Sequence, residues 1–163
     1  CLLLARNPKA HKRFSAAFEA KTVTKVYHGI LAGIPEEREG RIELSLAKIS
    51  SAEKGWRMIP AKKGKPSATE WRVVAEHEGR ALVEFRPETG RTHQIRVHAA
   101  SGIGIALVSD PVYGSRDGAP RTMLHASSIV VAREGKTDIA ATSLLPADFA
   151  ALGFPDPGAG DGA

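Results

Sequence analysis

The chain has 163 residues, 42% of them hydrophobic, which is enough for one substantial core and excludes disordered and fibrous classes. Its 23 Lys and Arg against 18 Asp and Glu give a net charge of +5, which favours a polyanionic partner without establishing one. A single cysteine excludes an internal disulfide, and no apolar run reaches the roughly 18 residues of a membrane span. With no signal-peptide pattern at the start, we expect a cytoplasmic protein without membrane contact.

Local signals in the first half of the chain predict one helix and several strands. Asn7 is expected to cap a helix with Pro8 in its first turn, running to about Ala20. A short apolar run at residues 1–5 is expected to be a strand. The other expected strands are residues 22–33, 41–46, 68–78 and 80–85, the last two forming a hairpin around residues 77–79.

Residues 47–67 combine many cations with little apolar periodicity, and we interpret them as a long, mobile basic loop. The cations are Lys48, Lys54, Arg57, Lys62, Lys63 and Lys65. RNA contact and plain solvation are both open for them. Trp56 and Met58 are expected to anchor the loop, with base stacking as an alternative for Trp56.

A strand, a turn and a helix are expected between residues 82 and 99. Thr92 is the expected N-cap of the helix, and at about 100° per residue His93 and Arg96 lie roughly 60° apart, so both face one site. Arg91 precedes the helix, where free N–H groups favour an anion. This corner is therefore a candidate anion or nucleobase site, with a solvated face as the alternative. A zinc site is excluded because His93 and His98 lie about 140° apart on a helix.

The remaining sequence predicts the end of a single domain. We expect a strand running from about Arg121 to Ala132 that includes His125 as a structural hydrogen-bonding residue, a short strand near Ile139, a helix from Pro146 with Phe149 and Leu152 facing inward, and a frayed tail. The expected domain covers residues 1–152 and the expected flexible tail covers residues 153–163.

Several motifs resemble those of one enzyme family. The sequence from Arg86 to His98, Arg-Pro-Glu-Thr-Gly-Arg-Thr-His-Gln-Ile-Arg-Val-His, resembles the signature of RluA-type RNA pseudouridine synthases. Lys25-Val-Tyr27, followed by an apolar run and Gly, resembles the family's Lys-x-Tyr strand. Ser109-Asp-Pro-Val-Tyr-Gly and Leu124-His-Ala resemble two further segments, although Ser109 stands where the family has Gly.

The resemblance implies an α+β fold, with a mostly antiparallel mixed sheet, flanking helices and a central RNA-binding cleft. It also implies isomerisation of a uridine in rRNA or tRNA to pseudouridine without a cofactor or a metal. We expect the protein to be a monomer. The target base must be flipped out of its helix, and an aromatic side chain then holds it. The alternative is a non-catalytic RNA-binding module of the same fold.

The resemblance also assigns roles to individual residues. Tyr27 would lie against the target base, and Arg96 would pair with the nucleophilic aspartate. That aspartate belongs to an Arg-Leu-Asp motif that precedes the Leu-Leu-Leu-Ala run in the family. We expect it upstream of Cys1, which makes the chain a part of a longer protein and inactive alone. The expected RNA-binding residues are Lys25, Lys62, Lys63, Arg91, His93 and Gln94.

Overall fold

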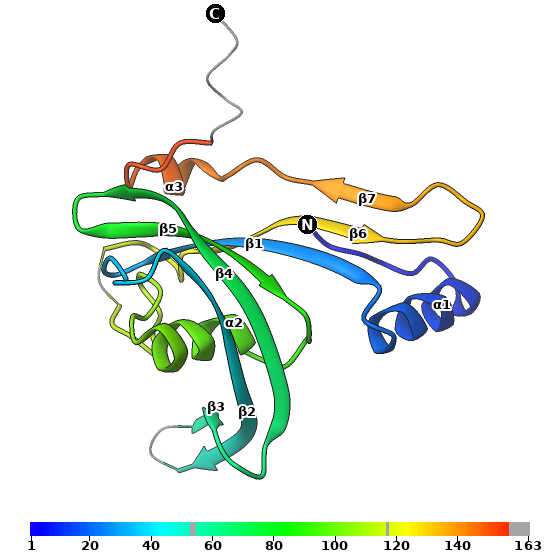
Figure 1. Ribbon diagram of the computed structural model, residues 1–163, viewed down its shortest axis with the longest axis horizontal. Helices are drawn as coiled ribbons and strands as arrows, with labels where there is room; N and C mark the ends of the chain where they lie inside the picture. The colour runs from blue at the N-terminus through cyan, green and yellow to red at the C-terminus, as the bar shows by residue number, and fades with distance from the viewer. Residues whose placement is uncertain (53–54, 117, 157–163) are drawn as a thin grey trace, which may run out of the picture.

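The computed structural model describes residues 1–52, 55–116 and 118–156, and its main element is an antiparallel β-sheet (Figure 1). The described strands are β1 (Val23–Leu31), β2 (Glu39–Ser51), β3 (Gly55–Pro60), β4 (Lys65–His77), β5 (Arg80–Pro87), β6 (Leu124–Val131) and β7 (Ile139–Thr142). They form one sheet in the order β3-β2-β4-β5-β1-β6-β7, so β3 and β7 are its edges. Neighbouring strands pair antiparallel throughout, which confirms the predicted α+β fold.

Short helices lie on both faces of this sheet. Helix α1 (Pro8–Glu19) begins as predicted, because the Asn7 side chain accepts a hydrogen bond of 2.9 Å from the Ala10 N–H. Helix α2 (Gln94–Val97) continues as the π-helical segment η1 (His98–Ile103) on one face, while α3 (Ala147–Ala150) lies on the other (Figure 1). The positioning of α2 against the sheet creates the site described below.

The prediction of a basic loop at residues 47–67 is wrong for most of that segment. Strand β2 continues to Ser51, β3 returns with Trp56 opposite Ser50, and only residues 61–64 form the turn that leads into β4. Buried Leu46 and Met58 pack together with Val97 of α2, so burial of one face stabilises the hairpin although Lys48 and Trp56 on it are exposed. The predicted cation Lys54 lies outside the described residues.

The β4–β5 hairpin is confirmed, but the N-terminal strand is not. Glu78 and Gly79 have φ values of 46° and 73°, as a two-residue hairpin turn requires, and His77 pairs with Arg80. Residues 1–5 have no regular secondary structure. The Cys1 amino group instead donates to the Ala126 carbonyl of β6, so this segment lies beside the sheet without pairing as a strand.

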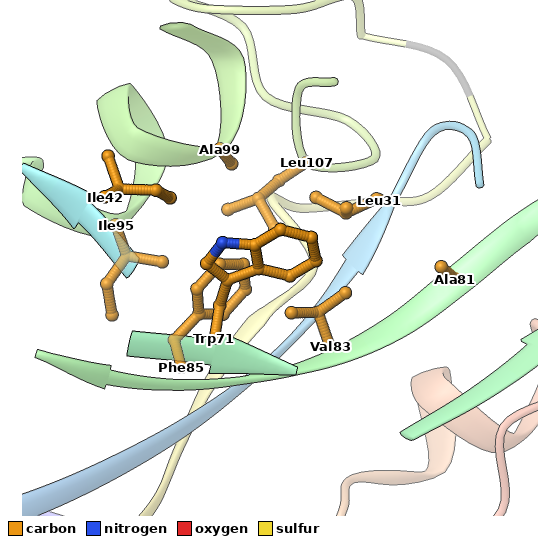
Figure 2. Close-up of a cluster of buried hydrophobic side chains, with 9 residues drawn as sticks. All are labelled: Leu31, Ile42, Trp71, Ala81, Val83, Phe85, Ile95, Ala99 and Leu107. Carbon is orange, nitrogen blue, oxygen red and sulfur yellow. The ribbon is translucent and has the colours of Figure 1, made fainter. Parts of the chain in front are cut away.

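The core has one apolar layer on each face of the sheet. On the α2 face, Trp71 and Phe85 pack under Ile95 and Ala99 (Figure 2). On the α3 face, Phe149 and Phe154 pack with a second cluster, and Phe154 is only 2% exposed. The packed chain therefore continues past residue 153, where the sequence placed the start of the tail. Residues 157–163 of that predicted tail lie outside the described part of the chain.

Candidate functional site

A cavity of about 400 Å³ lies between the sheet, the end of α1 and the start of α2. Six of the predicted site residues line it: Lys25, Tyr27, Arg91, His93, Gln94 and Arg96. Apolar Phe18 and Leu124 also line it, and the sequence did not single them out for this role. The cavity therefore joins cations and an aromatic ring with an apolar lining, a combination suited to a polar, flat ligand.

Tyr27 and Lys25 reach the cavity from strand β1. Tyr27 pairs with Phe85 across the sheet and packs against the core cluster on the α2 face, and burial raises the pKa of its hydroxyl. The Lys25 ammonium donates to the Thr89 carbonyl at 3.4 Å and lies 5.8 Å from the centre of the Phe18 ring. Burial lowers the pKa of Lys25. The sheet thus supplies a fixed aromatic wall with a cation beside it.

The turn before α2 differs from the prediction. His93, not Thr92, is the N-cap residue, with a positive φ of 53° and no side-chain cap. The Gln94 side chain holds this turn, because its carbonyl oxygen accepts from the Arg91 N–H at 3.0 Å and from the Thr89 hydroxyl at 2.7 Å. Gln94 thus closes the turn between residues 89 and 94 and does not take over the capping role expected of Thr92.

Gln94 is otherwise enclosed by the protein. Its amide nitrogen donates to the Ala68 carbonyl and to the Thr69 hydroxyl, both at 3.0 Å, and the residue is only 4% exposed. Both ends of the amide are therefore bonded within the chain. Gln94 holds the backbone of the exposed Arg91 at the mouth of the cavity, and because it also lines the cavity its RNA contact stays a prediction.

Arg96 forms a buried ion pair with Asp110. Its Nε and Nη2 atoms donate to the two carboxylate oxygens at 2.7 and 2.6 Å, and the Asp110 side chain is 1% exposed. Burial alone would raise the pKa of Asp110, but the hydrogen bonds from Arg96 and from two backbone N–H groups outweigh it and hold the pKa below its usual value. The family resemblance assigned Arg96 to an aspartate upstream of Cys1, which stays a prediction; the structure pairs Arg96 with Asp110, 14 residues away, a partner that the sequence did not indicate.

A chain of aromatic contacts connects His93 to the β2–β3 hairpin. The Tyr113 hydroxyl accepts from the Met58 N–H at 2.9 Å and shares a hydrogen bond of 3.0 Å with His93 Nδ1. Burial, followed by the charge of Arg96, lowers the pKa of His93. The other face of His93 stacks on Trp56, with ring centres 4.9 Å apart. His93 and Arg96 also both contact Tyr113, which confirms that they face one site.

Two predicted RNA-binding lysines lie outside this cavity. Lys62 and Lys63 are exposed in the turn between β3 and β4. Lys63 lines a neighbouring hollow of about 480 Å³ together with Lys48 and Lys65. That hollow shares Gly90 and Arg91 with the first cavity, so the two are adjacent. Lys62 lines neither of them.

His98 is a buried titratable residue close behind the site. It is fully buried, its Nε2 contacts the Ser67 hydroxyl at 2.8 Å, and its Nδ1 has no hydrogen-bond partner among the described residues. Because Ser67 already donates to the Leu44 carbonyl at 2.6 Å, its oxygen accepts from Nε2–H of a neutral ring. Burial lowers the pKa of His98 to about 4.

This shift predicts a loss of stability in acid. A histidine whose pKa is lowered in the folded state stabilises the protein fully above the unfolded pKa of about 6.5, and loses that contribution as the pH falls towards 4. By about pH 5 the free energy of unfolding should have fallen about 2 kcal/mol further in the wild type than in His98→Gln, which keeps a donor but does not titrate. Urea unfolding between about pH 5 and 7.5 measures this difference, and parallel curves for the two proteins would contradict it.

A larger hollow of about 620 Å³ lies on the opposite face of β5. Its buried acid, Glu84, accepts from Arg72 at 2.9 Å and from Arg86 at 2.8 Å. Acidic and basic side chains are mixed there, so this hollow lacks the excess positive charge that an anion requires. Within the described residues, no cluster of three or more His, Cys, Asp or Glu is placed to hold a metal ion, and no helix is long and apolar enough to cross a membrane.

Comparisons with known proteins agree with the fold and with the family resemblance of the motifs. Residues 1–101 match the family model described as RNA pseudouridylate synthase. An uncharacterized RNA pseudouridine synthase of Zymomonas mobilis is 54% identical over 156 residues, which cover 94% of this chain and 71% of that protein. Ribosomal large subunit pseudouridine synthase D of the same organism is 34% identical over 124 residues, covering 76% of this chain but only 38% of that protein.

Two solved human structures have the same fold. RNA pseudouridylate synthase domain containing 1 aligns with a TM-score of 0.69 and 27% identity over 94% of this chain and 75% of that chain. RNA pseudouridylate synthase domain containing 4 aligns with a TM-score of 0.71 over 88% of this chain and 66% of that chain, and at 18% identity it supports the fold alone. On the family model and the Zymomonas relative, this chain belongs to the RNA pseudouridylate synthase family.

Proposed function

We propose that this chain contributes the base-holding part of an enzyme that isomerises a specific uridine in RNA to pseudouridine. In this reaction the N1–C1′ bond breaks, the base rotates, C5 bonds to C1′, the hydrogen on C5 leaves as a proton, and N1 takes up a proton. The observation that carries the proposal is the cavity that combines Tyr27, Lys25 and Arg96 with an apolar lining. Stacking on an aromatic ring offsets part of the cost of flipping the base.

The cations divide into two roles under this proposal. Arg91 is exposed at the mouth of the cavity, where it is placed to meet the RNA backbone. Arg96 is half-buried and already bonded to Asp110, so it is placed to orient a carboxylate nucleophile with the guanidinium surface that Asp110 does not use. The proposed substrate is RNA. The enzyme is proposed to act as a monomer in the cytoplasm, without a cofactor or a metal.

The nucleophile in this proposal lies upstream of Cys1. Asp110 is a poor candidate because its carboxylate is enclosed and accepts hydrogen bonds from Arg96 and from the backbone of Val112 and Tyr113. The other aspartates that the structure describes, Asp138, Asp148 and Asp156, do not line the cavity. This chain by itself should accordingly bind RNA without modifying it.

The RNA class is proposed as rRNA or tRNA. One relative is named as a ribosomal large-subunit enzyme, which favours rRNA as the first substrate to test. Nucleoside chromatography of RNA incubated with protein expressed from the complete gene should show uridine replaced by an equal amount of pseudouridine.

Variants of Tyr27 test the role of the ring in the same assay. Tyr27→Phe keeps the stacking surface and should retain activity, whereas Tyr27→Leu should lower kcat/KM roughly five- to hundredfold. Equal activity of Tyr27→Leu and the wild type would remove Tyr27 from the site. RNA binding without any pseudouridine would instead identify a non-catalytic binding module.

A further inference from the structure

Trp56 is an exposed aromatic residue that the core does not require. It lies on β3, the edge strand of the sheet, and 47% of it is exposed to solvent. The other tryptophan, Trp71, is 8% exposed and packs in the main core cluster. A large aromatic side chain presented at an edge of the sheet is a candidate binding surface.

The position of Trp56 links it to both cavities of the site. One face of its ring stacks on His93, which lines the cavity proposed for the uridine, with ring planes 22° apart. The Lys48 ammonium lies 4.9 Å from the ring centre, and Lys48 lines the adjacent hollow. Trp56 therefore lies at the boundary between the two cavities.

The adjacent hollow has the charge that an RNA strand requires. Lys48, Lys63, Lys65 and Arg91 line it, and its lining includes no acidic residue among those described. Because it shares Gly90 and Arg91 with the uridine cavity, the basic surface is continuous from one to the other. An aromatic ring beside a basic groove is the arrangement by which proteins bind single-stranded nucleic acid.

We propose that Trp56 stacks on the base of a nucleotide next to the target uridine, while Lys48 and its neighbours contact the phosphates. Lys48 then leaves the ring of Trp56 to pair with a phosphate, and the incoming base takes its place. This inference rests on the proposed function, and it adds a residue that holds the RNA strand beside the target uridine. His93 supports the other face of the ring and couples the two subsites through one continuous stack.

Fluorescence tests this proposal directly, because the chain has only two tryptophans. The probe is a nine-nucleotide single-stranded RNA with one central uridine. Its binding should quench the emission of the wild type, and the quenching should disappear in Trp56→Phe, whose remaining emission comes from buried Trp71. Trp56→Phe should keep most of the affinity, whereas Trp56→Ala should weaken binding roughly five- to hundredfold.

Matched variants separate stacking from a general loss of structure. Leu144→Ala removes a residue that is 69% exposed and lies just beyond β7, at the opposite edge of the sheet, and it should leave affinity unchanged. Lys48→Ala should weaken binding, and it should reduce the slope of log affinity against log salt concentration by about 1. A probe that lacks the base next to the uridine should bind the wild type more weakly than the intact probe does. Trp56→Ala should bind these two probes equally well.

The outcomes distinguish this inference from the proposed function. If RNA binding does not quench the tryptophan emission of the wild type, and Trp56→Ala binds RNA as tightly as the wild type, the stacking role is overturned. The proposal for the uridine cavity would not be affected. No RNA binding by the wild type would overturn both. Quenched, Trp56-dependent binding by a complete protein that forms no pseudouridine would support the stacking surface and overturn the enzymatic proposal alone.

Discussion

Replacing Asp110 with alanine is expected to lower the free energy of unfolding by about 3–5 kcal/mol, because it breaks a buried ion pair. The Arg96 guanidinium would lose both carboxylate bonds in a position where its side chain is only 17% exposed. The backbone N–H groups of Val112 and Tyr113 would lose their acceptor as well. Chemical unfolding at about pH 7 measures the loss.

The chain offers a matched control for this variant. Asp148 accepts two bonds from Arg121, at 2.7 and 3.0 Å, in the same bidentate geometry, but the two side chains are 28% and 41% exposed. Asp148→Ala should therefore cost no more than about 1 kcal/mol. Equal losses in the two variants would show that burial of the Arg96–Asp110 pair does not determine its contribution.

Phe85→Ala is the second large expected effect, again about 3–5 kcal/mol of unfolding free energy. Phe85 is fully buried in the cluster beneath α2 (Figure 2). Its surroundings are tightly packed: a Cβ added to Gly29 would lie 2.6 Å from Leu107 and 3.2 Å from Phe85. Since neighbouring groups have little freedom to fill the cavity, we expect the upper part of this range.

The same substitution at an exposed phenylalanine gives the comparison. Phe18 is 43% exposed, and Phe18→Ala should cost less than about 1 kcal/mol. Phe85→Ala should also weaken RNA binding, because Phe85 lies opposite Tyr27 in the β1–β5 pairing and supports the wall of the uridine cavity. Thermal unfolding and RNA titration on the same samples test both effects, and a Phe85→Ala protein as stable as the wild type would contradict the packing described here.

Features of the fold that depend on neighbouring residues were predictable from the sequence. Asn7 and Pro8 define the start of α1 through a local cap, and residues 78 and 79 define a hairpin through their turn geometry. The full extent of β2 and β3 was not predicted in this way, although β2 pairs with the next two strands along the chain. The apolar signal of these two strands is sparse, because their buried residues are Ile42, Leu46 and Met58.

The same distinction applies to the candidate site: relations within the motif were predictable, and contacts with residues outside it were not. The motif from Arg86 to His98 predicted that His93 and Arg96 share a face, and both contact Tyr113. Spacing within that motif could not identify Asp110 as the partner of Arg96, because the contact depends on how the chain returns after η1. The role of Gln94 in the turn was not predictable for a related reason: it depends on the carbonyl of Ala68, a residue of β4.

The central claim is that the cavity around Tyr27 and Arg96 holds a uridine during isomerisation, and release of tritium from RNA labelled at uridine C5 tests it most directly. Only bond formation from C5 to the sugar removes that hydrogen. We predict release by the protein expressed from the complete gene, loss of release in its Arg96→Ala variant, and none from residues 1–163 alone. Release by residues 1–163 alone would contradict the upstream nucleophile, and no release by the complete protein on total cellular RNA would contradict the proposed activity.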